Sequence, residues 1–252
     1  MTIDGLSFVG VSRFGYQRTA DEAIRALDAE GIGTAAVAPM HPHDGDFGRA
    51  NRELAAAVRE SAGRLVGIAR VDPWDAELAV AQLTSAVTED DAKAVFLHPA
   101  EEHFPINNPV ARPIAERAAS LGIPVLVATG HHCMSEAAQV ARFAEWCPDT
   151  PVIMTNGGQL NISGMGQFDA QLALGSPNLY ILSSGVYRED FLERMVARFG
   201  AERLLFGSFA PQYDVRYEHQ RVLKVHVTDE QRELVLAGNA ERLFGLPRRI
   251  NS

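Results

Sequence analysis

The chain has 252 residues, of which 46% are hydrophobic and 22% charged, a balance typical of one globular domain with a large core. A net charge of -9 and a pI near 5.4 argue against nucleic acid or an anionic membrane as the main partner. The sequence has no apolar run of about 18 residues and no basic leader before its first apolar segment, so we expect neither a membrane span nor a secretory signal.

Apolar strands and helical segments alternate along the whole chain. The strands are expected to begin near Ile3, Gly33, Arg64, Lys93, Ile123, Pro151, Asn178 and Arg203. Their spacing, roughly 25 to 31 residues, is the length of a strand with its crossover helix. Eight such units predict a single (β/α)8 TIM barrel, of class α/β, over residues 1–252. A doubly wound open sheet is the less favoured alternative.

Caps and glycines mark the expected helix ends. Thr19 and Glu22 form a capping box that opens the first helix, and Gly31 ends it. Ser135 is expected to cap the fifth helix, while the sixth, after Phe168, is short and poorly defined. Apolar residues at helical spacing predict further helices near residues 54–62, 78–87, 110–121, 191–199 and 228–236.

Titratable residues gather just past the carboxyl ends of three predicted strands. They include six of the eight histidines: His41 and His43, His98 and His103, and His131 and His132. A barrel of this kind carries its chemistry at these strand ends. The two cysteines, Cys133 and Cys147, form no disulfide framework, which makes a reducing cytoplasm the expected location. Cys147 is expected to pack at a helix end.

Short phrases at the predicted strands recur in a fixed order, at residues 3–4, 67–73, 97–99, 124–130, 152–158, 205–208 and 238–245. In order and spacing they resemble the amidohydrolase-related metal-dependent hydrolases. These form a branch of the amidohydrolase superfamily that includes carboxymuconate-semialdehyde and resorcylate decarboxylases. The resemblance covers nearly the whole chain. It implies the same barrel, with a metal site at the strand tips.

The positions that the resemblance implies for metal ligands hold other residues in this chain. They are Leu6 and Phe8 on strand one, Ala128 on strand five, Asn156 on strand six and Phe209 on strand eight. Zinc and related ions need several N, O or S ligands at about 2 Å, and one amide cannot supply them. We therefore expect no metal and no cofactor. Phe8 and Phe209 are instead expected to pack together, with Leu6 nearby.

The polar loops allow two interpretations. His41, His43, Asp44 and Asp46, together with His131 and His132, could form a relocated metal site or an acid–base cluster. Alternatively, these loops are polar remnants of an enzyme ancestor, with Asp44 and Gly45 making a turn. The candidates for catalysis, if any remains, are His98, His131, His132 and Asn156.

Other strand-tip residues are weaker candidates. Cys133 beside two histidines suggests an activated thiolate, although adjacent loop residues usually point apart. Ser183 and Ser208 offer hydroxyl donors without a base visible in the sequence. The segment from Asn156 to Gln159 could hold a carboxylate or carbonyl, or could simply make a turn. Surface or ion-paired roles are expected for Arg13, Arg70 and Arg188, and packing roles for Trp74 and Trp146.

Three functions follow from this pattern. The favoured one is a catalytically degenerate barrel that forms a homo-oligomer or a complex with an active amidohydrolase paralogue. Its expected interface includes Phe104 and Ile106, or residues 164–168 with Phe168. The second is an enzyme with altered chemistry, a hydrolase or lyase acting on a small carboxylate or amide. The third is a small-molecule binding protein.

Overall fold

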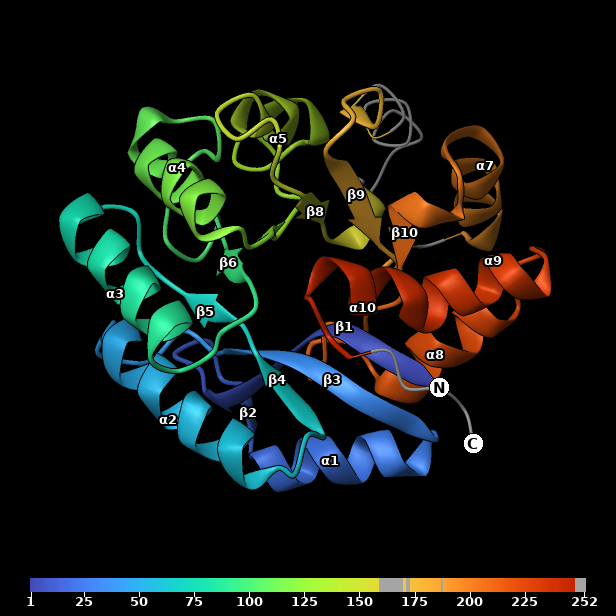
Figure 1. Ribbon diagram of the computed structural model, residues 1–252, viewed down its shortest axis with the longest axis horizontal. Coiled ribbons are helices and arrows are strands. Elements are labelled where there is room, and N and C mark those ends of the chain that lie inside the picture. The colour runs from blue at the N-terminus through green and yellow to red at the C-terminus, as the bar shows by residue number, and fades with distance from the viewer. Residues whose placement is uncertain (159–169, 171–172, 187, 248–252) are drawn as a thin grey trace.

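The computed structural model describes residues 1–158, 170, 173–186 and 188–247. It shows a ring of parallel strands surrounded by helices (Figure 1). The strands of the ring start close to the predicted positions. They are β1 (Thr2–Val11), β3 (Ile32–Pro39), β4 (Leu65–Gly67), β5 (Ala69–Arg70), β6 (Val95–Leu97), β7 (Val125–Val127), β8 (Val152–Met154), β9 (Leu179–Leu182) and β10 (Leu204–Leu205).

Two sheets close into one ring through backbone hydrogen bonds. One sheet has the order β2-β1-β3-β4 and the other β10-β9-β8-β7-β6-β5. On one side the sheets join between β4 and β5, which are separated in sequence by Ile68 alone. The N–H of Ile68 donates to the Val37 carbonyl at 2.8 Å. On the other side, Gly5 N–H donates to the Phe206 carbonyl at 2.9 Å. The predicted (β/α)8 fold is confirmed.

Helices cover the outside of the ring. They are α1 (Ala20–Ala29), α2 (Phe47–Glu60), α3 (Ala76–Thr88), α4 (Arg112–Leu121), α5 (Ala137–Ala144), α7 (Glu189–Phe199) and α8 (Val215–Leu223), with short 3-10 turns η1 (Pro109–Ala111), η2 (Asn156–Gly158) and η3 (Ala201–Arg203). The predicted capping box of Thr19 and Glu22 is present. The N-cap of α5 is Glu136 and not Ser135; the Gln139 side chain reaches back and accepts a hydrogen bond from Glu136 N–H at 3.0 Å.

The sequence pattern did not predict α8, which Asp214 caps by accepting a hydrogen bond from Tyr217 N–H. Most of its residues are polar, so the sequence shows no clear apolar face. Val215 and Val222, near its two ends, pack against the core. The sixth helix, expected after Phe168, lies outside the described residues.

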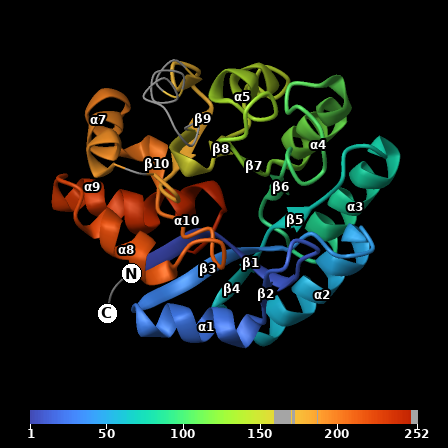
Figure 2. The same ribbon diagram turned by 180° about the vertical axis from the view of Figure 1, so that it is seen from behind.

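The C-terminal helical segment closes the amino end of the barrel. Helix α9 (Asp229–Glu233) starts at the predicted box and runs through a π-helical turn, η4 (Leu234–Gly238), into α10 (Asn239–Leu243). The Asn239 side chain donates to the carbonyls of Ala201 and Leu204 at 2.7 and 2.8 Å. Leu243 and Phe244 pack into the barrel. Figure 2 turns the other end toward the viewer, where β2 (Gln17–Arg18) folds back on β1.

The apolar core has two parts, one between strands and helices and one inside the barrel. Phe104 and Ile106 belong to the outer part and expose 0% of their surface. The exposed patch expected at Phe104 and Ile106 is therefore absent, because hydrogen bonds from Phe104 N–H to the Pro99 carbonyl and from Ile106 N–H to the Met134 carbonyl fold this loop inward. Residues 164–168 lie outside the described residues. Cys147 is buried, as expected.

Cys133 and Cys147 are both free thiols. Among the helices that the structure describes, none is long and apolar enough to cross a bilayer.

Candidate functional site

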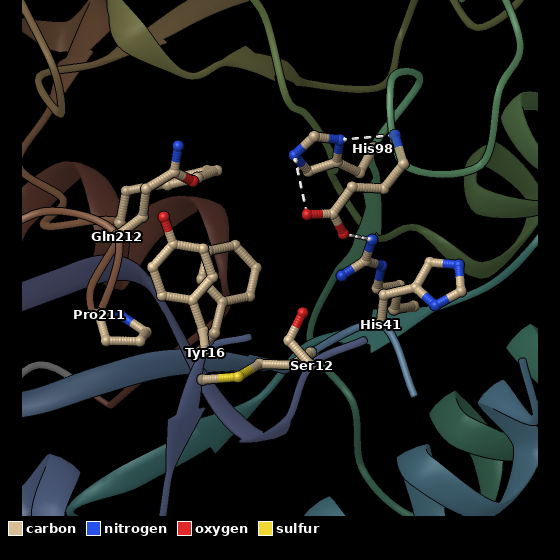
Figure 3. A pocket seen from close by; sticks show the side chains of 11 residues that line it. Ser12, Tyr16, His41, His98, Pro211 and Gln212 are labelled. Atoms are coloured by element: carbon tan, nitrogen blue, oxygen red, sulfur yellow. Dashed lines mark hydrogen bonds and ion pairs between the residues drawn. The ribbon is translucent and has the colours of Figure 1, made fainter. Parts of the chain in front are cut away.

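A pocket opens at the carboxyl end of the barrel, between the strand tips and the segment after β10. It encloses a cavity of about 30 Å³ and is lined by Phe8, Ser12, Tyr16, Met40, His41, Arg70, His98, Glu101, Phe209, Pro211 and Gln212. In Figure 3, Tyr16, Pro211 and Gln212 stand on one side of this pocket, and His98 and His41 stand on the other. The two sides differ in chemistry.

Two phenylalanine rings, Phe8 and Phe209, line the apolar side, and Phe96 packs against them. The Phe8 ring lies 4.8 Å from Phe209 in an edge-to-face arrangement and 5.1 Å from Phe96, measured between ring centroids. Leu6 belongs to the same buried cluster, so the predicted packing of these residues is confirmed. Phe209 has a left-handed φ of 57°, which is rare for an aromatic residue and places local strain at the tip of strand eight.

The residues at the implied ligand positions do not fit a metal ion. Leu6, Phe8, Ala128 and Phe209 are buried in the apolar core of the barrel. Asn156 is the remaining position; its Nδ2 donates to the Thr129 carbonyl at 2.8 Å, and its buried Oδ1 has no protein partner among the described residues. One amide oxygen is too small a donor set for a divalent ion.

A buried ion-pair network forms the polar side. Arg70 exposes 2% of its surface. Its Nε and Nη2 donate to Glu102 Oε1 at 3.0 and 2.6 Å, and Nη2 also donates to Glu101. The rings of Phe47 and Phe96 lie 5.3 and 5.4 Å from the guanidinium carbon. Arg70 is ion-paired, as one expectation held, but it is buried and not at the surface, because the loop after β6 brings two carboxylates over the tip of β5.

Glu102 connects this network to neighbouring elements. Burial raises the pKa of Glu102 to about 7, against the opposing effect of Arg70. Burial disfavours the charged guanidinium, but Glu102 and Glu101 outweigh that effect and raise the pKa of Arg70. The second Glu102 oxygen accepts a hydrogen bond from His98 N–H at 2.9 Å. Trp74, which is 56% exposed rather than packed, donates its Nε1–H to the Glu102 carbonyl at 2.7 Å.

His98 faces the pocket from the tip of β6 in a defined tautomer. Its Nδ1 accepts a hydrogen bond from Glu101 N–H at 3.2 Å, so the proton of the neutral ring lies on Nε2. Nε2 is 3.7 Å from Glu101 Oε1, which is longer than a hydrogen bond. Burial, with a further contribution from Arg70, lowers the pKa of His98 well below its usual range. The ring is therefore neutral near pH 7.

Two other histidines lie near His98. The His131 ring is 5.3 Å from the His98 ring, and burial lowers the pKa of His131. His41 Nδ1–H donates to the Pro42 carbonyl at 2.9 Å, which leaves Nε2 as an acceptor. Burial also lowers the pKa of His41.

The histidines and aspartates of the loop after β3 do not form one relocated metal or acid–base site with His131 and His132. His43 is exposed. Asp44 pairs with Arg49 at 2.9 Å, and Asp46 caps α2 by accepting from Arg49 N–H. Gly45 makes the turn that was the alternative interpretation, with a φ of 72°.

Ser183 and Ser208 hold strands together and do not line the pocket. Ser183 Oγ accepts a hydrogen bond from Gly207 N–H at 3.3 Å. Ser208 donates both its N–H and its hydroxyl to Asp4, at 2.7 and 2.5 Å. His132 and Cys133 lie outside the pocket, on the rim, and meet Glu136 there.

Comparison with known proteins gives the family. A family model described as amidohydrolase matches residues 5–246. The chain belongs to the amidohydrolase family. This confirms the resemblance in the sequence, while no curated protein matches the chain.

Solved structures share the fold of this family member at low identity. A dihydroxybenzoic acid decarboxylase from a Polaromonas species, solved with manganese and the inhibitor 2-nitroresorcinol, has a TM-score of 0.78 and 17% identity over 98% of each chain. A 2,6-dihydroxybenzoate decarboxylase from Rhizobium has a TM-score of 0.77 and 16% identity, over 98% of this chain and 99% of that one. A 5-carboxyvanillate decarboxylase from Sphingomonas paucimobilis has a TM-score of 0.75 and 14% identity, over 92% and 84%.

Sequence reasoning missed the acidic half of the site. Glu101 and Glu102 follow the family phrase at His98 by only a few residues, and Arg70 lies inside the phrase at residues 67–73. This proximity to matched phrases was the available signal. Tyr16 and Gln212 lie in irregular segments and carried no signal of their own.

Proposed function

We propose that this chain is a metal-independent member of the amidohydrolase family that binds a small hydroxyaromatic molecule at the barrel mouth. The observation that carries the proposal is the 3.7 Å gap between His98 Nε2 and Glu101 Oε1, beside a wall of phenylalanine rings. The gap and the rings line one pocket.

A hydroxyl group fits the polar side of this pocket. Its oxygen can accept from His98 Nε2–H and donate to Glu101, at about 2.8 Å from each. A ligand carboxylate fits less well. Its negative charge would lie beside the carboxylate of Glu101, with no uncommitted cationic group among the described residues that line the pocket to balance it. The Nε and Nη2 groups of Arg70 are already bonded to Glu101 and Glu102. The site therefore favours a phenolic hydroxyl over a carboxylate.

The apolar side has the chemistry to pack against a single aromatic ring. Phe8 and Phe209 offer ring edges and faces that pack against another ring, with Pro211 and Tyr16 opposite. The cavity of about 30 Å³ is well below the range of about 300–1,000 Å³ for ligand pockets, so a ring enters only if side chains at the mouth move apart. The dihydroxybenzoate and nitroresorcinol named with the solved structures are rings of this kind, which supports the proposal.

The test compares resorcinol with benzoate on protein stripped of metal by a chelator. Calorimetry or ligand-observed NMR should show resorcinol bound more tightly, since benzoate has no hydroxyl. Glu101→Gln should weaken resorcinol binding by roughly 10- to 100-fold, the range for a hydrogen bond to a charged group. Glu116→Gln, which alters an exposed pair with Arg112, is the matched control. Equal binding of both probes, or an unaffected Glu101→Gln variant, contradicts the proposal.

The same preparation tests whether catalysis occurs. The assay is release of carbon dioxide from 2,6-dihydroxybenzoate by metal-stripped protein. If carbon dioxide is released, and His98→Ala abolishes the release, the function is metal-free lyase activity and not binding alone. His98 and Glu101 are the groups positioned to exchange a proton with such a ring.

A second candidate is the partner or regulatory subunit. Val11, the last residue of β1, and Phe14, before β2, are 58% and 46% exposed, and the Phe14 ring lies 5.7 Å from the His41 ring of the pocket. These exposed apolar side chains favour an interface there. Light scattering on the chain alone, and mixed with an active family member, is the test. A monomer that binds no family member contradicts this candidate and leaves ligand binding untouched.

A further inference from the structure

Three metal-binding side chains converge on the rim of the barrel, outside the pocket. The ligand atoms of His132, Cys133 and Glu136 all lie within 4.8 Å of one another. This is the one such group of three or more among the residues that the structure describes. We propose that these residues bind a zinc ion, or a divalent ion of similar softness, at a site separate from the barrel mouth.

Glu136 holds the other two residues of the rim site in place. Its Oε1 lies 2.6 Å from His132 Nδ1 and accepts a hydrogen bond from Cys133 N–H at 3.0 Å. His132 and Cys133 are both exposed, so an ion reaches them from solvent.

The backbone beneath the rim site is fixed by hydrogen bonds. Ser135 N–H donates to the His131 carbonyl at 3.0 Å, and Ile106 N–H donates to the Met134 carbonyl at 2.7 Å. Gln139 accepts from Glu136 N–H at 3.0 Å and donates to the Cys133 carbonyl at 3.1 Å. The ligands therefore start from a loop that is already ordered, which lowers the entropy that binding must overcome.

The donor set selects the class of ion. A thiolate, an imidazole and a carboxylate together suit zinc, whereas magnesium and calcium prefer sites made entirely of oxygen. Three protein ligands leave the fourth tetrahedral position to water. On binding, the Cys133 thiol releases its proton to solvent, and the ion replaces the hydrogen bond between His132 and Glu136.

The rim site combines a histidine, a cysteine and a glutamate, whereas an ordinary surface ion pair has no cysteine. His226 Nδ1 lies 3.0 Å from Glu193 Oε1 and is 92% exposed, but no cysteine joins that pair. His226→Ala is therefore a matched control for His132→Ala. Cys147→Ala controls for the thiol, because Cys147 is buried and far from solvent.

The experiment is a titration of tag-free, chelator-treated full chain with cobalt(II), followed by competition with zinc. We expect one ion per chain and a thiolate-to-cobalt charge-transfer band that zinc abolishes. Cys133→Ser should remove the band, and His132→Ala or Glu136→Gln should weaken binding by more than about tenfold, the effect seen even for groups one shell further out. Zinc should also protect Cys133 from alkylation by iodoacetamide.

Several outcomes would overturn this inference. They are no charge-transfer band, binding that survives Cys133→Ser, or equal loss in the His226→Ala and Cys147→Ala controls. Circular dichroism shows whether each variant is folded. The probes here are metal ions and those of the barrel mouth are phenols, so the rim site and the proposed function fail independently.

Discussion

The two sides of the barrel mouth differ in how their residues are stabilised. On one side, the rings of Phe8 and Phe209 fill the space and are stabilised by van der Waals contact, without hydrogen bonds. On the other, Arg70 and Glu102 are equally buried but depend on each other for their hydrogen bonds. An apolar wall can accept substitutions that preserve volume, whereas a desolvated ion pair fails when either partner is removed. The two sides of the mouth therefore differ in the substitutions that each can accept.

The largest expected effect is on the polar side. Glu102→Ala removes two bonds to Arg70 and the acceptor for His98 N–H, and leaves a buried guanidinium half satisfied. We expect a loss of about 3–5 kcal/mol in the free energy of unfolding, measured with urea. Arg112→Ala, which breaks an exposed pair, should change little.

A double substitution sharpens that result. Arg70→Met with Glu102→Leu removes both charges and should recover part of the loss, because the cost comes from the unpaired charge. If Glu102→Ala is no worse than Arg112→Ala, then Glu101 alone satisfies Arg70 and the two sides of the mouth do not differ in this way.

The next effect is on the aromatic side. Truncating Phe8 or Phe209 to Ala should cost about 3 kcal/mol each, since both rings are buried against one another. The two losses should not add, because each ring is the other's neighbour. Thermal and urea unfolding of the single and double variants measure this.

Placing ligand residues on the aromatic side tests whether the mouth can still accept a metal. Phe8→His with Phe209→Asp buries polar groups that lack partners, so we expect destabilisation without metal uptake at the mouth. The measurement is best made in a Cys133→Ser background, which removes the rim site. An unchanged melting temperature would show that the rings are not part of a packed core.

Sequence patterns predicted the repeating features and missed the pairings across loops. Strand spacing and the box at Thr19 gave the barrel and a helix start, because both are local in sequence. The pairing of Phe8 with Phe209 followed from the closure of the barrel. Arg70 and Glu102 are 32 residues apart, and their contact depends on how the loop after β6 bends, which no local pattern encodes.

Burial was the second feature that the sequence did not reveal. Phe104 and Ile106 follow a strand in a polar loop, a context typical of exposed residues, yet backbone hydrogen bonds turn them into the core. Glu136 looked like part of a helix start, and its contacts with His132 and Cys133 exist only in the folded loop.

The smallest expected effect is a pH dependence that belongs to the polar side alone. Burial raises the pKa of Glu102 from an ordinary value of 4.5 to about 7. A carboxyl whose pKa is higher in the folded state binds its proton more tightly there, so it stabilises the fold fully below about 4.5. That contribution is lost as the pH rises through about 7. Wild type should therefore lose stability relative to Glu102→Gln between pH 5 and pH 8, on the order of 2 kcal/mol.

The difference between wild type and Glu102→Gln isolates this carboxyl from other titrating groups. Burial lowers the pKa values of His98 and His41, which reduces stability as the pH falls below about 6.5 and so acts in the opposite direction. Asp4 and Glu218, with pKa values raised by burial to about 6 and about 7, act in the same direction as Glu102. All four groups are present in both proteins and cancel in the difference. A flat difference would mean that Arg70 keeps Glu102 ionised throughout this range, and the polar side would then be a permanent ion pair whose stability does not respond to pH.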